Sequence, residues 1–252
     1  MTDRPVRWVV NTHYHPDHAW GNAVFAEAGA TIVARPETGE DLRRFSPVYL
    51  DYYRSYRPEA WALLEEVEVV EPDSLLGDAL VIDLGGVSVA VRYFGPAHTA
   101  GDAVVFVPEE RVVFTGGIAA AGYHPNLGDD GADFANWIRT LGEIEAFDPR
   151  AVVPGNGPVG GGESLRSTRE YILQLIELCE QRIRGGGSAW RAATEVVVPG
   201  REEDELANLL PFNVRAVYLA FVPKIVDPPF TFDLPVEFRV SDGAIEGLSL
   251  IH

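Results

Sequence analysis

The stretch that decides the fold is Asn11-Thr12-His13-Tyr14-His15-Pro16-Asp17-His18, which directly follows an apolar run at 6–10. His13 and His15 are two residues apart, so in an extended segment their imidazoles leave on the same side and can bind one ion. Pro16 suits the first turn of a helix, which would direct Asp17 and His18 toward the same pocket. The pattern indicates a metal site with two adjacent ligand sets, rather than a polar loop with unrelated histidines.

This stretch resembles the His-x-His-x-Asp-His motif of the metallo-β-lactamase superfamily at every position. The resemblance continues through Gly95-Pro96-Ala97-His98-Thr99-Ala100-Gly101-Asp102, Phe114-Thr115-Gly116-Gly117 and Pro154-Gly155-Asn156-Gly157-Pro158. It implies an αββα sandwich with the metal at one edge, and usually hydrolysis of an ester, thioester, amide, lactone or phosphodiester.

The same resemblance assigns His13, His15 and His98 to a first metal site. Three histidines leave a fourth position for water, which is the pattern of a catalytic zinc rather than a closed structural one.

The second site implied by the family is depleted. Asp17 and His18 are present, but Gly117 stands where the family has a bridging Asp, and Asn156 where it has a His. Glycine offers no side-chain ligand and an amide is a weak one for zinc. We therefore expect one divalent metal ion per chain, zinc, with iron or manganese as alternatives. We also expect Gly117→Asp combined with Asn156→His to rebuild the second site.

Asp17 and His18 are the candidate catalytic residues. Asp17 would orient or deprotonate a metal-activated water, while His18 or Asn156 would hold a polar group of the substrate. Asp17 could equally fix the tautomer of one of the histidines. Replacement metal ligands could come from His124, Asp129 or Asp130, whereas His124 could instead position a loop or face the substrate.

Residues 45–66 are rich in aromatic side chains and predict an inserted helical lid. Tyr52, Tyr53 and Tyr56 would then wall an apolar or aromatic substrate pocket. The alternative is ordinary packing of an amphipathic helix on the sandwich or on a dimer partner.

The hydrophobic pattern predicts an α/β fold, an αββα sandwich with this insertion at 45–66 and a C-terminal helix plus β-hairpin. We expect a metallo-β-lactamase-like domain at 1–184 and a C-terminal extension at 185–252 that packs on it. Predicted strands cover 6–11, 31–34, 67–70, 79–84, 87–94, 103–107, 112–115 and 151–153; predicted helices cover 17–28, a short segment from 36, 132–147, 163–184 and 202–221. Runs at 236–240 and 245–251 predict a hairpin around Ser241-Asp242-Gly243.

Members of this family usually have a strand-rich segment before the first histidine motif, whereas here His13 lies near the start. Either the hairpin at 236–251 covers that half of the first sheet, or a partner chain does, or the sequence begins inside the natural protein. Because an open sheet edge invites aggregation, we expect a homodimer or intramolecular capping.

The composition and charge of the chain limit which binding partners and which cellular compartment we expect. The net charge of −18 and the pI of about 4.6 oppose binding to phosphate backbones, so we expect a small-molecule substrate and no nucleic acid. No apolar run is long enough to span a membrane, and the first residues contain no export signal. The single Cys179 fits a reducing cytoplasm.

Three functions from different classes remain open. The first is a metal-dependent hydrolase of a small ester-, lactone- or amide-like compound that uses a mononuclear metal-activated water. The second is a non-hydrolytic metalloenzyme on the same fold, namely a lyase, cyclase or oxidative enzyme. The third is a catalytically inactive binding protein.

Overall fold

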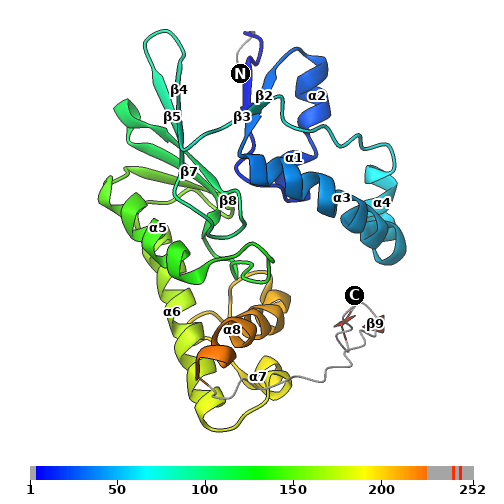
Figure 1. Ribbon diagram of the computed structural model, residues 1–252, viewed down its shortest axis with the longest axis vertical. Helices are drawn as coiled ribbons and strands as arrows, with labels where there is room; N and C mark the ends of the chain where they lie inside the picture. The colour runs from blue at the N-terminus through cyan, green and yellow to red at the C-terminus, as the bar shows by residue number, and fades with distance from the viewer. Residues whose placement is uncertain (1–3, 226–239, 242–243, 246–252) are drawn as a thin grey trace.

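The computed structural model describes residues 4–225, 240–241 and 244–245. A three-stranded sheet, in the order β1-β2-β3, faces a five-stranded sheet, in the order β4-β5-β6-β7-β8. In Figure 1 helices α1 to α4 lie on the side of the smaller sheet, while α5 and α6 lie along the larger one. The predicted α/β sandwich of two sheets and two helical layers is therefore confirmed.

The first part of the chain builds the smaller sheet from parallel strands β1 (Trp8–Val10), β2 (Thr31–Ala34) and β3 (Ser74–Leu75). Between β1 and β2, the single helix expected at 17–28 is two helices, α1 (Pro16–Ala19) and α2 (Asn22–Glu27). The break falls at Gly21, a weak helix former. The buried side chain of Asn22 also exchanges two amide hydrogen bonds of 2.9 Å with Asn11, which holds the chain at this point.

The aromatic segment is continuous with the helix before it. Helix α3 (Pro36–Tyr56) runs through the boundary expected at residue 45, and α4 (Pro58–Leu64) follows after Arg57. Pro47 lies inside α3 without ending it. The prediction of a strand at 67–70 is wrong. Those residues are irregular, and the chain pairs with β2 further on, at Ser74 and Leu75.

The larger sheet contains β4 (Ala79–Asp83), β5 (Ser88–Tyr93), β6 (Ala103–Val107), β7 (Val112–Ala120) and β8 (Ala151–Asn156). One face packs on the smaller sheet through Ile82, Val91 and Ala103, which contact Val33 and Leu76. The other face packs on α5 (Phe134–Ala146) and α6 (Glu163–Arg184). Because successive side chains on a strand point to opposite faces of the sheet, these strands separate the core into two layers.

The chain after α6 packs back onto it. Helix α7 (Ala189–Glu195) was not predicted, and the helix expected at 202–221 is α8 (Leu210–Ile225), preceded by a short 3-10 turn at Ala207–Leu209. Val214, Val217 and Tyr218 join the same core cluster as α6. Of the predicted C-terminal hairpin, β9 (Val240–Ser241) and β10 (Ala244–Ile245) pair antiparallel, and the rest lies outside the described residues.

The outer edge of β1 has no strand partner among the residues that the structure describes. Trp8 on this strand is 43% exposed, and Phe114 on β7 is 40% exposed. Strands β9 and β10 pair with each other and not with β1. What covers this edge therefore stays a prediction. Within the described ranges, no helix combines the length and the apolar character needed to cross a lipid bilayer.

Candidate metal centre

The loop after β1 is held between the two sheets by its backbone. The Asn11 amide donates to the Val33 carbonyl of β2, and the Thr12 carbonyl accepts from Ala103 of β6 at 2.7 Å. The carbonyl of His15 then accepts the first amides of α1, from His18 and Ala19. These bonds fix the histidine motif at the point where the two sheets meet.

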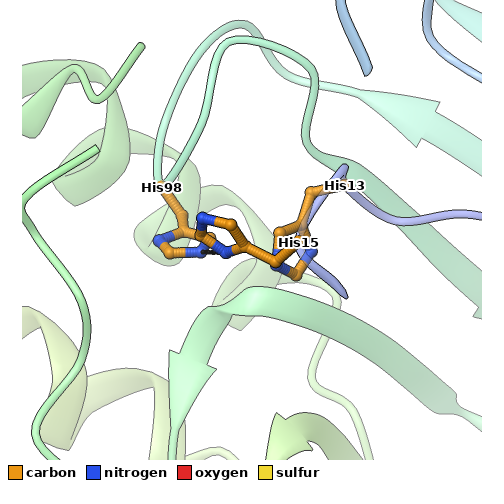
Figure 2. A group of neighbouring side chains, drawn as sticks. All are labelled: His13, His15 and His98. Carbon is orange, nitrogen blue, oxygen red and sulfur yellow. Dashed lines mark hydrogen bonds between the residues drawn. The ribbon is translucent and has the colours of Figure 1, made fainter. Parts of the chain in front are cut away.

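His13 and His15 from this loop meet His98 from the loop between β5 and β6 (Figure 2). One ligand nitrogen from each ring lies within 4.8 Å of the other two. The three residues are 1%, 8% and 4% exposed, respectively. Within the described part of the chain, this is the group of side chains suited to holding a metal ion.

The electrostatics of the cluster favour neutral imidazoles. Burial, assisted by the other histidines, lowers the pKa of His13 well below its usual value. Burial and the neighbouring His15 lower the pKa of His98 to about 3. A neutral imidazole keeps one nitrogen lone pair for a metal, so His13 and His98 are in the required protonation state at neutral pH.

Neighbouring groups select which nitrogen of each ring is free. Nδ1 of His98 donates to the Asn126 carbonyl at 2.9 Å, so its Nε2 is free, and this Nε2 lies 3.1 Å from Nδ1 of His15. Nδ1 of His13 lies 3.1 Å from the Thr12 hydroxyl. Two imidazole nitrogens on one tetrahedral zinc are on the order of 3.3 Å apart. The ring separation thus fits a shared ion.

The second predicted set is beside the first. The ring of His18 lies 4.2 Å from that of His13, and its Nε2 is 3.1 Å from Oδ2 of Asp17. Asn156 at the end of β8 donates to the same Asp17 oxygen at 3.3 Å. Burial alone would raise the pKa of Asp17, but the hydrogen bond and charge interaction with His18, together with hydrogen bonds from Asn156 and the backbone, lower it below its usual value. The carboxylate is therefore ionised, and its side chain is 59% exposed.

Gly117 changes the expectation about rebuilding a second site. A Cβ atom added at Gly117 would lie 2.1 Å from Cδ2 of His98, so the imidazole occupies the space that any side chain at this position needs. Likewise, a Cβ at Gly155 would lie 2.5 Å from Cε1 of His18. The glycines make room for metal-site imidazoles, and Gly117→Asp would displace His98 before it could add a ligand.

Hydrogen bonds from the loop that carries His98 converge on Asp102. The sequence motif contains this residue but did not predict its role. Its buried carboxylate accepts the backbone amides of Ala97 at 3.2 Å and Thr99 at 2.7 Å, and the Thr99 hydroxyl at 3.0 Å. These bonds bracket His98 on both sides. Asp102 therefore fixes the backbone that presents the third imidazole.

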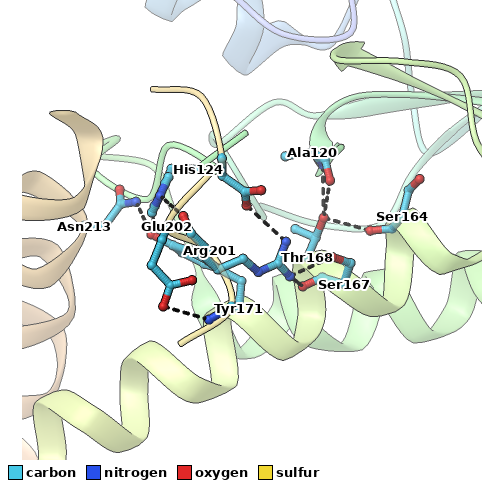
Figure 3. Close-up of polar contacts among 11 residues, drawn as sticks. Ala120, His124, Ser164, Ser167, Thr168, Tyr171, Arg201, Glu202 and Asn213 are labelled. Atoms are coloured by element: carbon cyan, nitrogen blue, oxygen red, sulfur yellow. Dashed lines mark hydrogen bonds and ion pairs between the residues drawn. The ribbon is translucent and has the colours of Figure 1, made fainter. Parts of the chain in front are cut away.

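His124, considered above as a ligand or a substrate contact, is engaged elsewhere. Nδ1 lies 2.9 Å from the Tyr171 hydroxyl and Nε2 lies 3.2 Å from the Arg201 carbonyl (Figure 3). Asn213 of α8 joins the same network through Tyr171. Since both ring nitrogens contact protein, the geometry supports the loop-positioning role and gives no support to metal or substrate binding by His124.

The aromatic wall on α3 differs in its members from the predicted one. Tyr52 and Tyr56 are 44% and 63% exposed and pack on each other, whereas Tyr53 contacts Trp20. Among the aromatic rings of α3, Tyr49 is the one that contacts a ligand histidine, at 6.1 Å from His15 between centroids. Helical spacing could have identified it, because Leu42, Phe45, Tyr49 and Tyr53 share one stripe of α3. Burial raises the pKa of Tyr49 to about 12, so its hydroxyl can donate a hydrogen bond at neutral pH.

Of the two acidic replacement ligands considered, Asp129 reaches the centre and Asp130 does not. Asp129 Oδ2 is 3.3 Å from Nε2 of His15, on the opposite edge of the ring from His98. Asp130 is exposed and lies 3.8 Å from Arg44.

The contact with Gly117 predicts that Gly117→Ala weakens metal binding at least about tenfold, which is ~1.4 kcal/mol, because His98 must move. Gly21→Ala is the matched control, since a Cβ there meets nothing within 4 Å. Competition with a chromogenic chelator measures the affinity. Unchanged affinity in Gly117→Ala would show that His98 can relocate without loss.

Comparison with known proteins agrees with the geometry. A family model described as "Metallo-beta-lactamase superfamily" matches residues 1–156. A type 2 metallo-beta-lactamase from Bacteroides fragilis is 31% identical over 118 residues, which are 46% of this chain and 47% of that protein. A linear primary-alkylsulfatase from a Pseudomonas species is 24% identical over 279 residues, 92% of this chain and 52% of that protein. The chain thus spans about half the length of these relatives.

Among solved structures, a metallo-beta-lactamase from Pontibacter korlensis superposes with a TM-score of 0.52 at 24% identity, over 68% of this chain and 70% of that one. This similarity supports the assignment of the fold. The family model covers well over half of the chain, and the histidine motif within it forms the buried cluster described above. The chain belongs to the metallo-beta-lactamase superfamily.

Proposed function

We propose that the protein is a hydrolase of a small ester-, lactone- or amide-like compound that uses one zinc ion held by His13, His15 and His98. The observation that carries this proposal is the convergence of three buried imidazoles next to an ionised, exposed Asp17. Three nitrogen ligands leave a coordination position open, as hydrolytic zinc sites require.

A divalent ion bound there would supply a Lewis acid and lower the pKa of water toward ~7. Asp17 is the group that can accept a proton from the attacking water, because it is ionised and exposed. His18 and the Asn156 amide hold the Asp17 carboxylate in place and offer donors to a polar group of the substrate. The ring of Tyr49 lies next to His15 and would form an aromatic wall for the substrate. Tyr53 lies on the same face of α3.

The names of the relatives add one candidate to the substrate class. The alkylsulfatase similarity extends over 92% of the chain, beyond the residues matched by the family model. A sulfate ester is therefore a second class to test. The net charge of −18 argues against a strongly anionic substrate, so a neutral ester or lactone remains the first choice.

The proposal predicts turnover of 4-nitrophenyl acetate or a simple lactone by the zinc-loaded protein, and a weaker rate with 4-nitrophenyl sulfate. Asp17→Asn should lower kcat by about 10² or more while metal content stays unchanged, because proton transfer and not binding is lost. The exposed Glu27→Gln on α2 is the control and should match the native rate.

Other outcomes favour the other classes. No turnover of any of the three compounds together with bound iron would favour a non-hydrolytic metalloenzyme. No bound metal at all would favour a binding protein.

We also propose a cytoplasmic homodimer that covers the outer edge of β1, supported by the lack of a strand partner there among the described residues and by the exposed Trp8 on this strand. Sedimentation equilibrium should give twice the chain mass of 27.6 kDa. Trp8→Glu should shift the protein to monomer, whereas Val24→Glu, at a position 70% exposed on α2, should not. A native monomer at micromolar concentration would contradict the dimer.

A further inference from the structure

We propose that Asn213, on helix α8 of the C-terminal extension, is a positioning residue for the metal centre: it holds the peptide group between Asn126 and Leu127, whose carbonyl oxygen orients His98. The proposal rests on the proposed function, since His98 is a ligand of the same site. Asn213 lies outside the residues that the family model matches.

One peptide group connects Asn213 with His98. Its carbonyl oxygen, from Asn126, accepts a hydrogen bond from Nδ1 of His98 at 2.9 Å. Its N–H group, from Leu127, donates to Oδ1 of Asn213 at 2.8 Å. A peptide group is planar, and in the trans form its C=O and N–H point in opposite directions, so a rotation of the plane breaks both bonds together. Each bond also polarises the peptide group and strengthens the other.

The partners of the Asn213 amide determine its orientation. The Leu127 amide only donates and therefore faces Oδ1, whereas the Pro125 carbonyl only accepts and faces Nδ2 at 2.7 Å. Nδ2 also donates to the Tyr171 hydroxyl at 3.0 Å. A flipped amide would oppose donor to donor and acceptor to acceptor. Asn213 is 0% exposed, so bulk water does not replace a bond that is lost.

The C-terminal extension holds the same loop at a second point. The His124 amide donates to the Glu205 carbonyl at 2.9 Å, and the Glu205 amide donates to the Gly122 carbonyl at 2.9 Å. The Tyr171 hydroxyl, which Asn213 contacts, lies 2.9 Å from Nδ1 of His124 (Figure 3). The loop that orients His98 is therefore fixed by residues about 80 positions further along the chain.

The test compares Asn213→Leu, Asn213→Asp and the control Val217→Ala. Leucine is similar in size to asparagine and has no polar atom, while aspartate keeps an oxygen that accepts from Leu127. Val217 is on the same helix and is also fully buried, so its substitution destabilises the same core and leaves the polar bonds in place.

Three measurements are made on each protein. Chelator competition gives the zinc affinity, and thermal melts give the stability. In the metal-free protein, ¹⁵N-correlated NMR of the imidazole nitrogens gives the tautomer of His98, and hydrogen exchange gives the protection of the Leu127 amide.

The native protein should show His98 protonated on Nδ1 and a slowly exchanging Leu127 amide. Asn213→Leu should populate the Nε2-protonated form and bind zinc about 10-fold more weakly, the low end of the loss seen when a direct partner of a ligating histidine is removed. Asn213→Asp and Val217→Ala should melt at lower temperature but keep the native tautomer and nearly the native affinity.

Native affinity together with an unchanged His98 tautomer in folded Asn213→Leu would overturn the proposal. An equal loss of affinity in Val217→Ala would also overturn it, because affinity would then follow stability and not this bond. If Asn213→Leu does not fold, the native protein decides, since rapid exchange of the Leu127 amide would show that the bond to Asn213 does not hold.

The readouts on the metal-free protein do not depend on turnover. Inactivity toward every ester would contradict the proposed function and leave the result for Asn213 intact. Should the native protein bind no zinc, the His98 tautomers of the native protein and Asn213→Leu still decide whether Asn213 positions this ring.

Discussion

The structure depends on three imidazoles that are buried at the junction of two sheets. Such rings are costly to bury unless their nitrogens find partners. Here each ring has one nitrogen engaged by the protein, through Thr12, Asp129 or the Asn126 carbonyl. The remaining nitrogens face one another, and a cation among them satisfies all three at once. The loops, glycines and carboxylates around the centre hold the three rings in that arrangement.

Two of the residues around the centre support the proposal of a single metal ion. Gly117 gives the His98 ring its space, and Asn156 bonds to Asp17 instead of offering an imidazole. A substitution that adds a carboxylate at 117 would act first on His98. In the function proposed above, the small polar cluster of Asp17, His18 and Asn156 takes the place of the second ligand set and serves proton transfer and substrate binding.

Much of the fold could be predicted from the sequence, because its periodicity is local. Helix α6 has the bounds expected from its amphipathic pattern and the glycine tract after it, and β2 and β6 match as well. The three histidines could be predicted from two motifs. The continuous α3, however, depends on packing of its stripe on Tyr14 and Trp20, which outweighs the local signal of Pro47. Asp129 and Tyr49 reach His15 across long sequence separations, and no local pattern reports such contacts.

The most direct test of the account combines elemental analysis with X-ray absorption of the zinc-loaded protein. One zinc per chain is predicted, with three imidazole nitrogens at about 2.0–2.1 Å and one lighter oxygen ligand. His98→Ala should lose one of the nitrogens. Two tightly held ions per chain, or a shell with fewer than three imidazoles in the native protein, would contradict the central claim.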